Sequence, residues 1–426
     1  AHLAAGELDD AAKDLDAALA KSPDDEAALL ARAEVDLARG DAKAAAARLA
    51  SRAGAPAASG GLLVTYAAAL RASGAREQAK PILEKLAGAG GTLAGRAWLE
   101  RARLARDESD LAGARAAYAK AVEALPRGQA GAPWIDARLE GAVLSIDLGE
   151  VATGKEQLDR LVADAPGDGR VLVEAARAHT LLGDLAASKD LLDKAEAAPT
   201  APRWKVARER GRLAIRKRDV TQAVESLERA ASLAPDDGET RLLLIDANIL
   251  GKDDTAARRG LGDVLARFKG RPEAALAGGR VAYYFSKDSE ARTDFQQARD
   301  ALVKAKAPAR AVADATYWLG RVRYDDNPDE ARKLLVEATT LDPTLADAYV
   351  FLGLIDVDKN APGSAVTWFQ KATTLDPENI DTWFDLGQAA VAAKQPLIAK
   401  TAYTEYLHRA PNGDNAADAR AALKKL

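Results

Sequence analysis

Few residues of this sequence are of the types that carry out catalysis or bind metals. The 426 residues contain no cysteine, which excludes disulfides, cysteine-ligated zinc, iron–sulfur clusters and thiol catalysis. The three histidines, His2, His179 and His408, lie far apart, and none has a neighbour at metal-ligand spacing. No glycine-rich loop follows a strand-like segment, so no phosphate-binding loop is predicted. We therefore expect no catalytic residue, no metal and no cofactor.

The most prominent charged segment of the chain is basic. Between Arg203 and Arg218 lie eight basic residues and a single acid, Glu209. Four of the cations are spaced by three, four and four residues, which places them on one helical face: Lys205, Arg208, Arg212 and Arg216. Arginine binds carboxylates through two parallel hydrogen bonds, so this face, the basic ladder, is a candidate site for an acidic partner. The alternative is a solvated basic helix balanced by acids of neighbouring helices.

The overall composition is that of a helical globular protein. Hydrophobic residues make up 48% and charged residues 29% of the chain, and abundant alanine favours helices. The 60 basic and 64 acidic residues give a net charge of −4, so no nucleic-acid partner is predicted. No apolar run reaches the length of a membrane-spanning helix, so no direct membrane insertion is expected. The compartment stays open, with the cytoplasm favoured over the periplasm.

A pattern of side-chain sizes repeats along the whole chain. A small residue is followed four residues later by a large apolar residue, and three residues after that by another apolar one. Successive copies are 34, 34, 35, 40, 34, 35, 34, 34, 40, 34 and 34 residues apart. We interpret the two longer intervals, near Pro126–Pro133 and Lys304–Arg310, as longer loops. The small residues are Ala11, Ala45, Ala79, Ala114, Gly154, Ser188, Ala223, Ala257, Ala291, Ala331, Ala365 and Ala399.

Each copy of the pattern is predicted to form two helices. In residues 346–379, apolar residues at three- and four-residue spacings mark two helical faces. The segment Lys359–Gly363 predicts the turn between them, and Pro377 ends the second helix because proline disfavours helix for the residue before it. Such a period is typical of an array of helical repeats.

This pattern resembles the tetratricopeptide repeat, with about twelve repeats over nearly the whole chain. The resemblance implies an all-α, right-handed α-solenoid superhelix of antiparallel helix pairs. The segments Gly238–Pro272 and Glu273–Ala307 depart from it, because they have lost the Leu-Gly pair. The best matches are Leu319-Gly320, Ala331, Ala338 and Pro343; then Leu352-Gly353, Ala365, Phe369, Ala372 and Pro377; then Leu386-Gly387, Ala399, Tyr403, Tyr406 and Pro411.

The resemblance also predicts four segments within one continuous superhelix. Residues 1–126 form repeats 1 to 4, the first of them truncated, and residues 127–307 form repeats 5 to 9. Residues 308–413 form the best-matching repeats, 10 to 12. Residues 414–426 form a capping helix, whose predicted apolar stripe is Ala419, Leu423 and Leu426. A repeat array needs such a cap to cover its last hydrophobic face.

In the family, the first helix of each pair lines a concave groove. By this resemblance the basic ladder occupies groove positions of its repeat. A weaker basic set lies in the fourth repeat: Arg96, Arg103 and Arg106. Aromatic residues at or beside groove positions would anchor an apolar peptide or helix, or they belong to the core: Tyr283, Tyr284, Tyr317, Tyr324, Phe351 and Phe384.

The resemblance implies a protein-interaction scaffold without catalysis. We expect its groove to hold a peptide, helix or small domain of a partner, such as an acidic peptide or a small GTPase or motor component. The alanine- and arginine-rich composition favours a bacterial assembly, secretion, envelope or motility and polarity complex. The asparagine clamp of chaperone-binding relatives is missing. The alternative function is a substrate-recruiting or regulatory arm of a larger enzyme whose catalytic domain is absent from this sequence.

Overall fold

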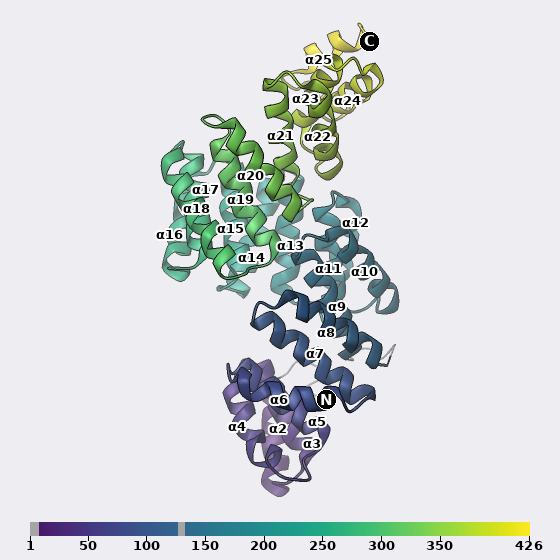
Figure 1. Ribbon diagram of the computed structural model, residues 1–426, viewed down its shortest axis with the longest axis vertical. Coiled ribbons are helices and arrows are strands. Elements are labelled where there is room, and N and C mark those ends of the chain that lie inside the picture. The colour runs from purple at the N-terminus through teal and green to yellow at the C-terminus, as the bar shows by residue number, and fades with distance from the viewer. Residues whose placement is uncertain (1–7, 127–132) are drawn as a thin grey trace. The chain divides into compact units, whose positions relative to one another are not determined.

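The computed structural model describes residues 8–126 and 133–426, and every regular element in these ranges is a helix (Figure 1). The all-α prediction is therefore confirmed. The chain divides into two compact units, Ala1–Gly141 and Ala142–Leu426. The predicted truncated start of the first repeat (1–7) and the predicted loop at 127–132 lie outside the described residues. The division into the four segments 1–126, 127–307, 308–413 and 414–426 remains a prediction.

The helices follow one another with short turns. The first unit contains α2 (Leu8–Lys21), α3 (Glu26–Ala38), α4 (Ala42–Ala53), α5 (Gly60–Ala72), α6 (Arg76–Ala87), α7 (Gly91–Asp107) and α8 (Leu111–Ala124). The boundary between the units falls within α9 (Pro133–Asp147). The second unit continues with α10 (Val151–Asp164), α11 (Gly169–Leu181), α12 (Leu185–Ala197), α13 (Arg203–Arg216), α14 (Val220–Leu233), α15 (Gly238–Leu250), α16 (Asp254–Arg267), α17 (Pro272–Tyr284), α18 (Asp288–Lys304), α19 (Ala309–Arg323), α20 (Pro328–Leu341), α21 (Ala346–Asp358), α22 (Pro362–Leu375), α23 (Ile380–Ala392), α24 (Pro396–Arg409) and α25 (Ala416–Leu423).

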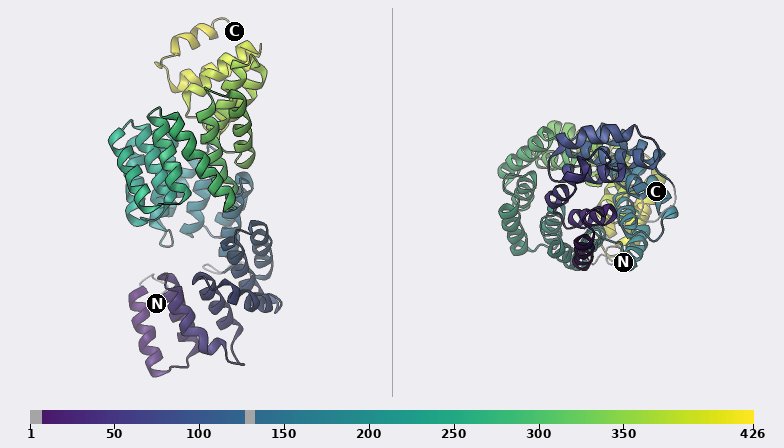
Figure 2. Two further views of the ribbon diagram at one scale, coloured as in Figure 1. Left: turned by 60° about the vertical axis from the view of Figure 1, so that its left-hand side comes forward. Right: turned by 90° about the horizontal axis from the view of Figure 1, so that it is seen from below.

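Within each unit, successive helices pack as pairs (Figures 1 and 2). In the second unit these pairs run from α11 with α12 to α23 with α24. The first helix of a pair also contacts the first helix of the next pair, as α13 does with α15 and α19 with α21. This arrangement is an α-solenoid, in which the first helices together form one face. In the described part of the chain, no helix is long and apolar enough to cross a membrane.

In most pairs the turn between the two helices contains one residue with a positive φ, which is a glycine in some pairs and another residue, such as Arg218 or Asn360, in others. Gly183 adopts a positive φ of 83° after α11, a conformation that glycine reaches without steric cost. The side chain of the next residue, Asp184, then accepts a hydrogen bond from the backbone N–H of Ala187 at 3.2 Å and so caps α12. The predicted turn at Lys359–Gly363 and the predicted helix end before Pro377 are both confirmed by the bounds of α21 and α22.

The small residues that mark the repeat are the contact points between helices. All of them, from Ala11 to Ala399, are buried. The large residue four positions later fills the space opposite a glycine of the first helix. A Cβ atom added to Gly387 would lie 2.5 Å from the ring of Tyr403. Real Cβ atoms do not approach so closely, so the absence of a side chain sets the helix spacing.

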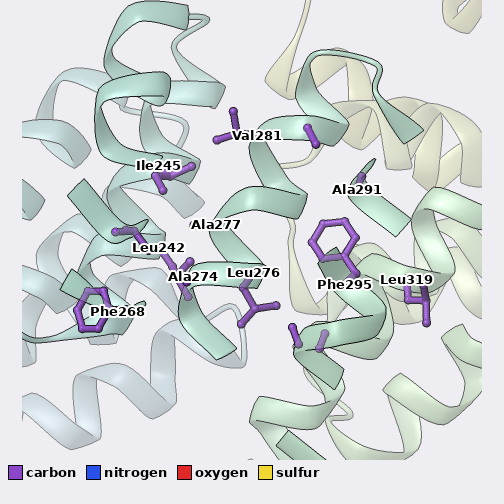
Figure 3. Close-up of a cluster of buried hydrophobic side chains, with 14 of the residues drawn as sticks. Leu242, Ile245, Phe268, Ala274, Leu276, Ala277, Val281, Ala291, Phe295 and Leu319 are labelled. Carbon is purple, nitrogen blue, oxygen red and sulfur yellow. The ribbon is translucent and has the colours of Figure 1, made fainter. Parts of the chain in front are cut away.

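The two segments that lack Leu-Gly still form complete helix pairs, α15 to α18. Figure 3 shows their shared core, where Phe268 and Phe295 are buried among aliphatic and alanine side chains. A Cβ atom on Gly279 would lie 2.5 Å from the Phe295 ring. Gly279 therefore takes the place of the motif glycine, and only its leucine neighbour is lost.

The structure corrects two expectations about the C-terminal half of the chain. The predicted longer loop at 304–310 is wrong: α18 is 17 residues long and runs to Lys304, and α19 begins at Ala309. The additional residues of this interval extend the helices. The capping helix is present as α25, with Ala419 fully buried. Its predicted stripe is shorter than expected, because α25 ends at Leu423 and Leu426 is 44% exposed.

Distant repeats of the second unit also touch one another. The turn after α13 meets the end of α22, where the Arg218 guanidinium lies 3.2 Å from the carboxylate of Asp376 and Arg216 donates to the carbonyl oxygen of Leu375. A Cβ atom on Gly149 would lie 2.0 Å from the carbonyl oxygen of Leu341. These contacts join segments that lie at least 158 residues apart in the sequence and close the curve of this unit.

Candidate partner-binding groove

A cavity of about 1010 Å³ opens along the first helices of the second unit. It is lined by α13, α15, α17, α19 and α21 and by the start of α23. We call this cavity the second-unit groove. Its apolar and aromatic lining consists of Ile215, Ile249, Leu250, Tyr283, Tyr284, Trp318, Phe351 and Ile380. A hollow of this size and lining is the kind of surface that accepts side chains of a ligand or partner.

An arginine stands among aromatic rings at the centre of this groove. The guanidinium carbon of Arg321 lies 4.9, 5.0 and 5.3 Å from the ring centres of Tyr283, Trp318 and Phe351. Arg321 also donates a hydrogen bond to the hydroxyl oxygen of Tyr317, at 3.2 Å. Cations are attracted to aromatic faces at these distances. The groove therefore already holds one cationic side chain against its aromatic wall.

Carboxylates outnumber cations along the same groove. Arg280 is neutralised by Asp246 and Asp314, at 2.5 and 2.6 Å. The other groove carboxylates are exposed, and none of the ion pairs between described residues includes them: Asp288, Asp325, Asp347, Glu378 and Asp381. Apart from Arg321, the remaining groove cation is Arg218, which is engaged by Asp376. The open groove thus carries an excess of negative charge.

This negative field extends to the side chains beside the groove. Burial and then the negative charge of Asp381 raise the pKa of Asp385 to about 6. Burial and a hydrogen bond donated by its hydroxyl to Asp358, at 2.8 Å, raise the pKa of Tyr324 to about 12. A carboxyl or phenol group becomes harder to ionise when it is desolvated and surrounded by like charge. Among the described residues, no cluster is arranged to hold a metal ion.

The basic ladder lies on α13, at the side of the groove nearer the N-terminus, and is engaged within the chain. Lys205 donates to Glu174 at 2.6 Å. Arg208 is only 5% exposed and lies 2.9 Å from both Glu209 and Glu239. Arg212 contacts the same two glutamates. Arg216 contacts the end of α22. The four cations therefore face acids and carbonyl groups of neighbouring repeats.

The buried ion pairs around the ladder hold their acids in the charged form. Burial acts to raise the pKa of Glu209, but Arg212 and Arg208 hold it below its usual range. Glu239 is held well below its usual pKa by Arg208 and Arg212, again against burial. Arg177 of α11 joins the network, at 3.3 Å from Asp147. Positive and negative groups here balance one another, so little charge is left for an external ligand.

The basic residues predicted in the first unit are placed in a similar way. Arg103 contacts Glu100 and Glu140, both at 2.5 Å. Arg106 forms a hydrogen bond with Tyr118, and this bond opposes the increase in the pKa of Tyr118 that burial causes. Arg96 lies beside Gly61, with its Nη1 atom 4.0 Å from where a Cβ would stand. These three residues do not form a shared open basic patch in the described structure.

The predicted aromatic residues separate into groove and core. Tyr283, Tyr284 and Phe351 line the second-unit groove. Tyr324 packs edge-to-face on Phe351, with ring centres 5.4 Å apart. The other two are corrections to the groove expectation, because they belong to the hydrophobic core and are only 5% and 7% exposed: Tyr317 and Phe384.

Sequence reasoning missed the acidic lining and the central Arg321–Trp318 pair. A signal for the acids was available. Asp347 and Asp381 both stand at the second position of their repeats, one of the positions that the family resemblance assigns to the groove. Reading these positions for both signs of charge, in place of basic residues alone, would have found them.

Comparison with known proteins identifies the repeats. Two family models described as tetratricopeptide repeat match the chain, one at residues 140–202 and 208–275 and the other at residues 346–379. The chain therefore contains tetratricopeptide repeats at these residues. Repeats of this family support a role as a protein–protein interaction scaffold. Among curated proteins, no sequence matches this tetratricopeptide-repeat chain.

Solved structures of similar chains exist at low sequence identity. A chain of the APC/C hetero-tetramer Cut9-Hcn1 is 13% identical, with a TM-score of 0.44, over 100% of this chain and 94% of that one. Yeast Tom70 is 15% identical, with a TM-score of 0.46, over 94% of this chain and 89% of its own.

Proposed function

We propose that this tetratricopeptide-repeat protein is a non-enzymatic scaffold that holds a peptide, helix or small domain of a partner in the second-unit groove. The observation that carries the proposal is the groove itself, a cavity of about 1010 Å³ lined by the first helices of successive repeats. Exposed carboxylates and aromatic rings occupy its wall without filling it. Aromatic side chains in a concave surface are typical anchors of protein interfaces.

A more specific proposal concerns the number of repeats and the kind of complex in which the protein acts. We propose about twelve repeats and a bacterial assembly, secretion, envelope or motility and polarity complex, on the basis of the repeat spacing and the alanine- and arginine-rich composition. A small GTPase or a motor component is the kind of small domain that fits such a complex. The full-length gene and its neighbours test this setting, and a catalytic domain on the same polypeptide would favour the enzyme-arm alternative.

Site-specific photo-crosslinking tests the scaffold proposal directly. A photoreactive phenylalanine analogue at Phe351 stands in the groove, whereas the same analogue at Leu397, which is 81% exposed on a second helix, stands outside it. We expect partner adducts at Phe351 that are missing at Leu397. Equal adducts at both positions would contradict binding in the groove.

An acidic partner on the basic ladder remains a separate hypothesis. Such a partner would have to displace Glu174 and Glu239, because these acids already engage the ladder. The informative variant is Lys205→Gln, because the Lys205 side chain is one-third exposed, more than those of the other three ladder cations. Loss of binding of an acidic peptide in this variant would support the ladder as a site, and unchanged binding would oppose it.

A further inference from the structure

The charge of the second-unit groove is not balanced within the chain. Five exposed carboxylates line the groove and form no ion pair between described residues, whereas each of its three arginines contacts acids or aromatic rings of the chain. Arg280 pairs with two aspartates, Arg218 contacts Asp376, and Arg321 stands among rings. The neighbouring basic ladder, by contrast, is neutralised by its own acids. The part of this face that is open is therefore acidic.

The geometry of the acids also suits a ligand that lies along the groove. Asp347 lies in the first turn of α21 and Asp381 in the first turn of α23, so they repeat at the spacing of the helix pairs. Asp288 and Asp325 follow α17 and α19 on the same cavity. A ligand with cationic groups at intervals would meet these carboxylates in turn. A compact cation would meet only one or two of them.

The aromatic wall between these acids has the chemistry to hold both cationic and apolar side chains. Arg321 demonstrates the first of these, because its guanidinium lies within about 5 Å of two ring centres. Ile249 and Ile380 supply aliphatic surface in the same cavity. Lysine and arginine side chains combine an apolar stem with a charged end, which matches a wall of rings rimmed by carboxylates.

We propose that the second-unit groove selects a partner segment rich in lysine and arginine and interspersed with apolar residues. This inference rests on the proposed scaffold function and names the chemical class of its partner. Complementary charge steers such a segment to the groove and disfavours acidic segments, since like charges facing each other are repelled. The aromatic and aliphatic wall then anchors its apolar residues.

The test is a selection of random 12-residue peptides, displayed on phage, against the full chain. The groove variant combines Asp347→Asn and Asp381→Asn, two exposed substitutions. The matched control combines Glu225→Gln and Glu228→Gln, which remove the same charge from exposed, unpaired positions of α14. Circular dichroism confirms that all three proteins keep their helicity. Individual selected peptides are then measured by fluorescence anisotropy at low and high salt.

We expect selected peptides to be enriched in lysine and arginine over aspartate and glutamate, relative to the starting library. Their affinity should fall about tenfold in the groove variant, remain within about twofold in the control, and weaken with salt. Enrichment of acidic or uncharged peptides would overturn the cationic selectivity while leaving the scaffold function standing. Equal loss in both variants would also overturn it. No enrichment of any peptide would count against the selectivity and the scaffold proposal together.

Discussion

Replacing Asp385 by asparagine should stabilise the protein at neutral pH and much less in acid. Asp385 lies on α23, one turn after Asp381, and takes part in no ion pair between described residues. Burial and the charge of Asp381 raise its pKa from 3.8 to about 6. A raised carboxyl pKa means that the folded state binds this proton more tightly than the unfolded state. The charged form therefore weakens folding as the pH rises through about 6.

The size of the effect follows from the shift. A pKa displaced by about two units corresponds to at most about 3 kcal/mol, and partial exposure to water reduces this to about 1–2 kcal/mol. We expect Asp385→Asn to raise the free energy of unfolding by that amount at pH 7.5. At pH 4, close to the unfolded-state pKa of 3.8 and well below the folded-state pKa of about 6, most of this difference should be lost.

Urea unfolding followed by far-ultraviolet circular dichroism at pH 4 and pH 7.5 measures this difference. Glu228→Gln is the control, because Glu228 is exposed and lies in no ion pair between described residues. Its effect should be within about 0.5 kcal/mol at both pH values. A gain of equal size at the two pH values, or a loss at pH 7.5, would refute the reasoning, since either result would mean that the Asp385 charge is not the cause.

Three further predictions concern packing. Gly387→Ala, where a Cβ would lie 2.5 Å from a ring, should lower the free energy of unfolding by about 1–3 kcal/mol, whereas Gly363→Ala, which faces open space, should lower it little or not at all in the same urea assay. Gly149→Ala and Gly270→Ala both place alanine at positive φ, but only Gly149 meets another backbone; its cost should exceed that of Gly270→Ala by at least about 2 kcal/mol, and equal costs would contradict the contact. Deleting residues 415–426 should expose the last repeat and cause aggregation in light scattering; a monomeric truncated protein of equal stability would remove the capping role.

The repeats could be predicted from the sequence because their signal is local. The spacing of small residues such as Ala365 and of large residues such as Phe369 reports directly on which side chains meet between two adjacent helices. Pro377 and the turn before α22 mark the helix ends in the same direct way. The spacing could not tell whether a 40-residue interval lengthens a loop or a helix, because it reports on the residues that meet between two helices and not on where each helix ends.

The site was less predictable, because its contacts connect different repeats. The segment around Arg208 contains a single acid, Glu209, but two further acids that neutralise Arg208 come from the next pair, at Asp237 and Glu239. Arg208 and Asp237 are 29 residues apart in the sequence, which is close to the length of one repeat. Charge counted along the chain therefore gave a basic surface where the folded protein has a balanced one. The open carboxylates of Asp347 and Asp381 belong to α21 and α23, whose sequences contain three and two aspartates and no basic residue, a smaller one-sided excess than the basic one of α13.

The contact between the turn after α13 and the end of α22 changes the mechanics of the second unit. In a linear array each repeat touches only its neighbours, so repeats detach one at a time from an end. Arg218 and Asp376 instead join positions 158 residues apart, and the repeats between them form a closed loop. When this segment is pulled from its ends, the contact between Arg218 and Asp376 should break first, in a single step, before the repeats between them extend. The same contact should limit changes in the spacing of the intervening repeats, and with it changes in the spacing of the groove carboxylates.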